Sequence, residues 1–414
     1  MKLFVCTASA LTAVVLALSA CGPSRDDPNR LTIWEQMDPA EQELLREHLD
    51  VFEEEHPGVR VDVVHFETDN LRSNFQTAAL AGTGPDLIYG PSDGVGPYSI
   101  MGLIWPLDAP ELGIPADTLD LYLEDAKPKV DGRVYRLADQ VGNHLTLVRN
   151  TEFVPAAPAD TEELIRIARE NTVDTDGDGR VDRYGIVFNL AEPFWLLPWL
   201  GGYGGWVMDD DANPTLDTPA MRKALAFVRR LVDEGVIPPS CDYPLSDTLF
   251  KQGKAAMIIN GPWSWQAYRD AGVDIELSVI PRIAGTDDYP TPSTASKGYA
   301  LNIHTPAVRL DLAVDLLMYL TSAPVVGNLS AEIGTLPSRL DVGEWPRIAN
   351  DPLLNASWEQ LKKGRAMPVV PEMRALWDVM RPGMQRVVSG SATPDEAARE
   401  MQEDAVRKIE EMKM

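Results

Sequence analysis

The chain has 414 residues, of which 44% are hydrophobic and 24% are charged, and its formal net charge is -26. This composition is typical of an ordinary globular protein, and the length favours two domains. The strong negative charge argues against nucleic acid as a partner, because phosphates would be repelled.

The N-terminus has the pattern of an export signal. Lys2 precedes an apolar stretch at residues 3–20, which ends in small residues just before Cys21. The pattern predicts a signal peptide over residues 1–20. Since the motif resembles the lipobox of bacterial lipoproteins, we expect acylation of Cys21, a polar tether over 21–29 and an extracytoplasmic protein anchored by lipid to the cell membrane. The alternative is an uncleaved anchor helix, for which about 18 apolar residues is the short limit.

Strands and helices are expected to alternate in the first third of the chain. Apolar or alternating runs predict strands at 31–34, 59–66 and 86–89. Amphipathic patterns between them predict helices at 39–55 and at 70–81, where the second ends before its glycines. This order implies a parallel sheet with right-handed crossovers.

Polar residues follow the ends of these strands. They are Asp38 after the first strand, Asn70 and Arg72 after the second, and Ser92 and Asp93 after the third. In open sheets of this kind, ligands bind beyond the carboxyl ends of the strands. We therefore expect these segments to form one wall of a pocket, although Asp38 also suits a helix N-cap.

The third loop also contains a hydrolase-like pattern. Gly90, Ser92 and Gly94 have the spacing G-x-S-x-G, and His144 and His304 follow later in the chain. A nucleophile elbow also needs oxyanion donors, and no glycine-rich oxyanion motif precedes Ser92. A lipid-anchored ester hydrolase, or a glycoside hydrolase with paired carboxylates, is therefore kept only as the alternative to a binding protein.

The middle of the chain carries aromatic residues on turns. Residues 189–210 and 250–268 mix tryptophans with glycine and proline, and the glycines of 189–210 are expected to break any regular helix. Such rings suit the flat aliphatic faces of sugars, while polar neighbours bind the hydroxyls. The alternative is that most of these rings belong to the core, which we favour for Trp195, Trp199, Trp206 and Trp265.

Four stretches, in this order, carry a resemblance to a known family. They are "GTGPDLIY" (82–89), "NLAEPF" (189–194), "GKAAMIINGPWSW" (253–265) and "KKGRAMPVVPEMRALWDVM" (362–380). The chain resembles the extracellular solute-binding proteins of carbohydrate ABC importers, of the maltose-binding protein type, over roughly residues 31–410.

The resemblance implies an α/β fold of two lobes, like that of periplasmic binding proteins, in which each lobe is a sheet flanked by helices. Hinge crossings join the lobes, which close on a sugar and deliver it to the importer's permease subunits. We expect a monomer that is not an enzyme. Lobe I would comprise 30–143 and 297–340, and lobe II 144–296 and 341–414.

The family's sugar contacts can be carried over by position. Stacking rings fall on Phe194, Trp263 and Trp377, and polar contacts on Asp38, Asp93 and Glu192, while Asn70, Arg72 and Asn143 occupy further contact positions with different chemistry. Phe194 replaces a tyrosine, Gly90 a tryptophan, Gly94 an arginine and Pro39 a lysine. These departures leave maltose itself in question, so we expect a maltodextrin-like oligosaccharide. Arg72 and Arg374 leave a phosphorylated polyol open.

An acidic loop suggests a cation. Asp174, Asp176 and Asp178, with Asp182 at the ninth position, match half of a calcium loop, but the twelfth position is Gly185. An EF-hand is therefore excluded. We expect a structural calcium site between a helix and a strand at "YGIVF" (184–188), and the alternative is an empty acidic turn. No cofactor is required.

Overall fold

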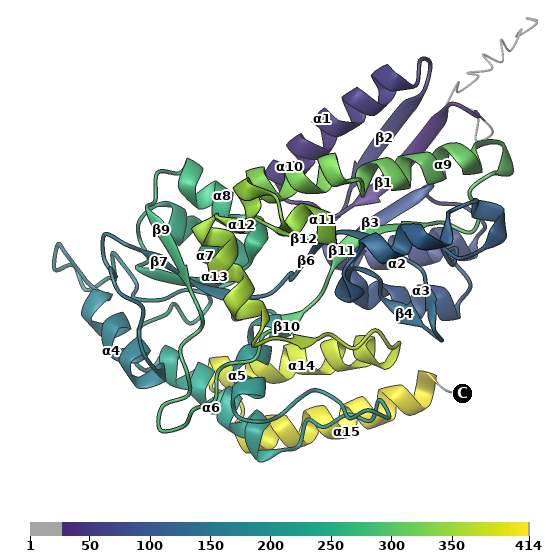
Figure 1. The fold of residues 1–414 in the computed structure, drawn as a ribbon. Helices are drawn as coiled ribbons and strands as arrows, with labels where there is room; N and C mark the ends of the chain where they lie inside the picture. The colour runs from purple at the N-terminus through teal and green to yellow at the C-terminus, as the bar shows by residue number, and fades with distance from the viewer. Residues whose placement is uncertain (1–26, 413–414) are drawn as a thin grey trace, which may run out of the picture.

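The computed structural model describes residues 27–412, which form two lobes joined by crossing segments (Figure 1). The expected signal peptide, Cys21 and most of the tether lie outside these residues.

The first lobe is built on a six-stranded sheet with the order β12-β6-β11-β3-β1-β2. Strands β1, β2 and β3 are parallel, as predicted, and β11 is antiparallel to β3 and β6. Helices α1, α9 and α10 cover one face, and α2 and α3 cover the other. The strands are β1 (Arg30–Glu35), β2 (Arg60–His65), β3 (Leu87–Pro91), β6 (Leu137–Val141), β11 (Lys297–Leu301) and β12 (Leu336–Pro337), and the helices are α1 (Pro39–Glu55), α2 (Thr68–Leu80), α3 (Val95–Ile100), α9 (Ala307–Leu320) and α10 (Ala323–Ile333).

Local sequence signals account for the start of this lobe. Asp38 is the N-cap of α1, and its backbone N–H donates to the carboxylate of Glu41 at 3.1 Å, as in a capping box. The smaller elements of the lobe are a hairpin of β4 (Lys129–Val130) and β5 (Arg133–Val134), and the 3-10 helices η1 (Ser92–Gly94), η2 (Pro110–Leu112), η3 (Ala116–Leu121) and η4 (Glu124–Ala126).

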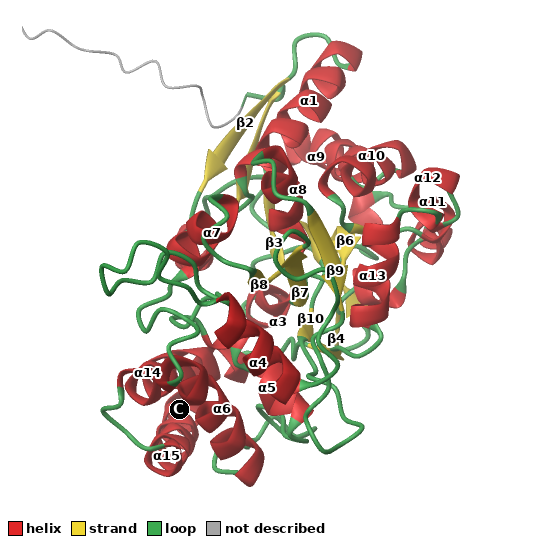
Figure 2. Cartoon of the chain, turned by 90° about the vertical axis from the view of Figure 1, so that its left-hand side faces the viewer, coloured by secondary structure: helices red, strands yellow, loops and turns green. Residues whose placement is uncertain are grey.

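The second lobe contains a three-stranded sheet with the order β8-β7-β9, in which β7 is antiparallel to both neighbours. Its C-terminal helices α14 and α15 pack side by side against α6 (Figure 2). The strands are β7 (Thr146–Asn150), β8 (Met257–Asn260) and β9 (Ile275–Ser278), and the helices are α4 (Thr161–Asn171), η5 (Pro193–Trp195), α5 (Leu197–Gly202), α6 (Pro219–Asp233), α7 (Tyr243–Lys251), α8 (Pro262–Asp270), α14 (Glu372–Ser389) and α15 (Pro394–Met412).

Three segments pass between the lobes. The first joins β6 to β7, the second runs through β10 (Ser293–Thr294) into β11, and the third contains β13 (Arg365–Ala366), which pairs with β10. Val342, Ile348 and Leu354 belong to the core of the first lobe, whereas the sequence assigned everything after 340 to the second. These residues lie on three short helices that follow β12, namely α11 (Leu340–Gly343), α12 (Pro346–Ala349) and α13 (Pro352–Leu361).

Helix α5 is short and ends at Gly202, in keeping with the expectation that glycines break a regular helix here. Gly201 lies against the second crossing, where a Cβ would lie 2.5 Å from the Cβ of Thr291. One local expectation was wrong. "YGIVF" is not a continuous strand, since only Tyr184 and Val187 bridge to the segment around β8.

Among the described residues no single helix is long and apolar enough to cross a membrane. Helices α9 and α10 meet that test only as a pair, bent by 47°.

Candidate ligand-binding cleft

A cavity of about 660 Å³ lies between the two lobes. Its first-lobe wall comes from the segments that follow β1, β2 and β3, and its second-lobe wall comes from η5 and helices α7, α8 and α14. Because β1, β2 and β3 are parallel, their carboxyl ends meet at one edge of the sheet, and that edge faces the second lobe.

The first-lobe wall is polar. Asp93 is buried, and one of its carboxylate oxygens accepts a hydrogen bond from Arg72 at 2.5 Å. Its other oxygen, Oδ1, has no hydrogen-bond partner within residues 27–412, and the same holds for Nε2 of Gln36. Both residues line the cavity, so this wall carries polar side chains whose hydrogen-bonding capacity is not used up by the described residues.

The second-lobe wall is aromatic. Phe194 and Trp263 have ring centroids 6.5 Å apart, and both lie beside Trp195. Trp377 lines the same cavity from α14. Rings from three separate segments of the chain therefore face the polar wall of the first lobe.

Two carboxyl groups in the cleft have shifted pKa values. Burial raises the pKa of Asp38 to about 6, and the nearby Glu41 carboxylate adds to the shift. Burial also raises the pKa of Glu192, although its partner Arg381 opposes that change. Lys297 partly offsets the negative charge of Asp38 and Glu41 on this side of the cleft. Its ammonium group lies 3.1 Å from each carboxylate oxygen of Glu41.

Eight of the ten residues that the sequence assigned to ligand binding line this cavity, and two do not. Asn70 is exposed on α2, which turns Asp69 and Arg72 to the cavity instead, since positions i and i+3 share a helix face. Arg374 is exposed and pairs with Asp69. The eight are Asp38, Arg72, Asp93, Asn143, Glu192, Phe194, Trp263 and Trp377.

Several residues that line the cavity were not predicted from the sequence. Arg381 follows Trp377 by four positions on α14, so the helix period could have revealed it. Tyr243 had no local signal, because tertiary packing brings α7 to the cleft. Trp195 was assigned to the core, and it both packs there and lines the cavity. The missed residues include Gln36, Asp69, Asn189, Trp195, Tyr243, Lys297 and Arg381.

The other three tryptophans assigned to the core lie there. Trp199, Trp206 and Trp265 are buried in the core of the second lobe. Gly90, where the family's tryptophan is absent, is not among the residues that line the cleft, and a Cβ there would meet the side chains of Gln36 and Leu71 at ordinary contact distance.

Ser92 does not belong to a catalytic triad in the described part of the chain. It lines a separate cavity of about 260 Å³ beside the crossings. His144 is buried with its Nε2 3.4 Å from the hydroxyl of Ser357.

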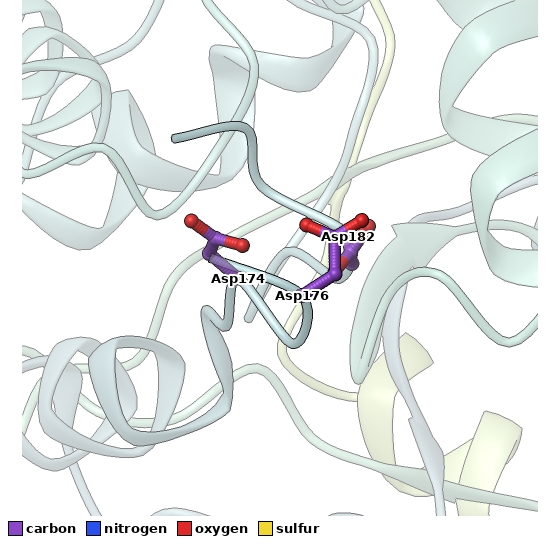
Figure 3. Close-up of side chains that lie close together, drawn as sticks. All are labelled: Asp174, Asp176 and Asp182. Atoms are coloured by element: carbon purple, nitrogen blue, oxygen red, sulfur yellow. The ribbon is translucent and has the colours of Figure 1, made fainter. Parts of the chain in front are cut away.

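The acidic loop gathers three of its four aspartates (Figure 3). Carboxylate oxygens of Asp174, Asp176 and Asp182 lie within 4.8 Å of one another. This spread fits Ca²⁺, which binds oxygen ligands at about 2.3–2.6 Å. Asp178 is outside the group. Its carboxylate accepts the backbone N–H of Arg180 at 2.8 Å.

Comparison with known proteins identifies the family. The family model of the bacterial extracellular solute-binding proteins matches residues 48–356. The maltose/maltodextrin-binding domain MalE from Bdellovibrio bacteriovorus, solved with maltotriose, is 42% identical with a TM-score of 0.89, and the match covers 92% of this chain and 100% of that one. The galactooligosaccharide-binding protein of Bacillus subtilis is 25% identical over 96% of this chain and 95% of its own length.

A maltooligosaccharide ABC transporter solute-binding lipoprotein of Streptococcus pneumoniae is 23% identical, over 97% of this chain and 95% of its own length. These relatives confirm the two-lobe fold, and they are binding proteins, so the hydrolase alternative has no support. The chain belongs to the bacterial extracellular solute-binding proteins and is not an enzyme.

Proposed function

We propose that this protein binds a neutral, maltodextrin-like oligosaccharide in the cleft between its lobes and delivers it to an ABC importer. The observation that carries the proposal is a cavity between the lobes with aromatic rings on one wall and carboxylate, amide and guanidinium side chains on the other. A sugar offers an aliphatic face to the rings and hydroxyl groups to Asp93 and Gln36. Relatives whose names specify maltooligosaccharides and galactooligosaccharides support this ligand class.

Capture would occur by closure of the lobes. The rings lie on the second lobe, and Asp38, Arg72 and Asp93 lie on the first, so a ligand contacts both sets only when the lobes are together. The ligand therefore binds the closed form more tightly and shifts the population towards it. The permease subunits would then distinguish the loaded form from the empty one.

We also propose that Cys21 is acylated and anchors the protein to the outer face of the cell membrane. The small residues before Cys21 and the polar tether after it support this proposal. Incorporation of labelled palmitate into the full chain, and its loss in Cys21→Ala, would test it.

A thermal-shift screen tests the binding proposal. Residues 22–414 would be screened against mono- and oligosaccharides, and each sugar would be checked afterwards for cleavage. A ligand at 100 times its Kd adds about 2.7 kcal/mol of stability. A stabilised protein with an intact sugar is the expected result, and no shift with any sugar of the panel would contradict the proposal.

For the acidic loop we propose a structural calcium ion held by Asp174, Asp176 and Asp182. Their carboxylates are close enough to share one ion, and oxygen ligands of this kind suit Ca²⁺. The ion would join α4 to the segment that runs beside β8.

A further inference from the structure

Charged side chains form a continuous chain across the cleft, which we call the cleft ion chain. It runs from Asp93 to Arg72 (2.5 Å), from Arg72 to Asp69 (3.8 Å), from Asp69 to Arg381 (3.1 Å) and from Arg381 to Glu192 (2.9 Å). The signs alternate at every step. The first three residues belong to the first lobe and the last two to the second, and all five line the cavity.

The link between the lobes is at Arg381. Its Nη2 donates both to Glu192 of its own lobe, at 2.9 Å, and to Asp69 of the other lobe, at 3.1 Å. Its Nε donates to the same oxygen of Glu192 at 3.1 Å. When the lobes part, Arg381 keeps Glu192 and loses Asp69, so the Asp69 contact is specific to the closed arrangement.

Asp69 has a second partner on the same helix. Arg374 Nη1 lies 3.4 Å from Asp69 Oδ1, while Arg381 occupies Oδ2. One carboxylate of the first lobe therefore accepts from two arginines of α14. Charge-assisted hydrogen bonds of this kind are stronger than neutral ones, and half-buried pairs lose less to salt screening than fully exposed pairs.

We propose that Asp69 and Arg381 are positioning residues of the binding site, and that their interlobe ion pair favours closure and holds Glu192 towards the ligand. The proposal rests on the proposed function. Neither residue has to touch the sugar for this role. The pair adds stability to the closed form whether or not a ligand is present, so it raises affinity mainly by slowing ligand release.

The test combines interlobe distances with binding kinetics. Spin labels or fluorophores on the two lobes would report the closed fraction without ligand, and stopped-flow tryptophan fluorescence would give association and dissociation rates for maltotriose. In Asp69→Asn we expect a lower closed fraction and a dissociation rate raised about three- to tenfold, with a smaller change in the association rate. Added salt should speed release from the wild type and have less effect on the variant.

Two variants control for charge and shape. Asp50→Asn removes the same charge from an exposed pair with Arg46 inside α1, and it should change neither readout. Asp69→Glu keeps the charge and should recover part of the closed fraction. Unchanged distances and release rates in Asp69→Asn, or equal changes in Asp50→Asn, would overturn the proposal. A wild type that binds no sugar would overturn the proposed function instead, while the ligand-free distances would still decide for or against the interlobe pair.

Discussion

Trp263 donates its indole N–H to the hydroxyl of Tyr243 at 2.9 Å. The donor is on α8 and the acceptor on α7, and both residues line the cleft. This bond holds the indole ring in one orientation at the wall of the cleft. Gly261 supports the same orientation, because a Cβ at that position would lie 2.1 Å from the Trp263 ring.

Replacing Trp263 should weaken sugar binding. In Trp263→Ala we expect at least tenfold lower affinity, about 1.4 kcal/mol, because the stacking surface is lost. Titration calorimetry with the sugar found in the screen would measure the change, and circular dichroism would check the fold. Trp358→Ala removes a tryptophan that is 39% exposed on α13, outside the cleft, and should leave affinity unchanged. Unchanged affinity in Trp263→Ala would remove this ring from the site.

Gly261→Ala tests the orientation of the ring without removing it. The added methyl group must displace the Trp263 ring, so we expect a several-fold loss of affinity and a change in intrinsic fluorescence. Gly343→Ala is the matched control, because nothing lies within 4 Å of the Cβ added there. Equal affinities in the two variants would show that the ring position does not matter for binding.

Local sequence patterns predicted the helix bounds that depend on capping and on apolar periodicity. The bounds of α1 follow from its apolar period and its cap at Asp38, and α15 begins at Pro394 with Thr393 and Glu396 bonded as a capping box. The site was predicted less completely. Asn70 was one position out of phase, because α2 begins at Thr68 and turns its neighbour Asp69 to the cleft.

Contacts between the lobes could not be predicted from local pattern. Arg381 and Asp69 are more than 300 positions apart, and their pairing depends on how the two lobes meet. The same is true of Tyr243, which reaches the cleft through the packing of α7. The family resemblance gave eight of the lining residues, but it did not include those that join one wall to the other.

Substitutions at the neighbouring residues Ser92 and Asp93 should affect sugar binding differently. Ser92 lines a separate cavity and not the cleft, so Ser92→Ala should leave sugar binding within twofold of the wild type. Asp93→Asn changes the residue that pairs with Arg72 and holds the unpaired Oδ1, so we expect at least a tenfold loss. Affinities from calorimetry would decide, and a larger loss in Ser92→Ala than in Asp93→Asn would contradict this assignment.

Sugar binding should depend on pH through Asp38. Its pKa in the free protein is raised to about 6, so the carboxyl gains a proton as the pH falls through 6 and offers fewer acceptors to a hydroxyl. We expect affinity to fall several-fold between pH 7.5 and pH 5. Because the folded-state pKa is raised, protonation also stabilises the free protein relative to the unfolded chain as the pH falls from 6 towards 4.

Calorimetry at several pH values checks the prediction for Asp38. In Asp38→Asn the fall in affinity should become shallower, and what remains reports the other titratable groups of the cleft, among them Glu192, whose pKa is also raised by burial. A wild-type affinity that is constant from pH 7.5 to pH 5 would show that Asp38 does not accept from the ligand.

Calcium should stabilise the second lobe through the acidic loop. We expect the Tm of residues 22–414 to rise by a few degrees between EDTA and millimolar CaCl₂, because an ion that binds the folded loop shifts the equilibrium away from the unfolded chain. Asp176→Asn removes a carboxylate of the group and should abolish most of the rise. Asp178→Asn is the control, because it makes the same chemical change at an aspartate outside the group. The two carboxylates also have similar local roles, since Asp176 accepts the backbone N–H of Asp178 and Asp178 accepts that of Arg180. If both variants lose the rise equally, or if the wild type shows none, the loop is an acidic turn and not a calcium site.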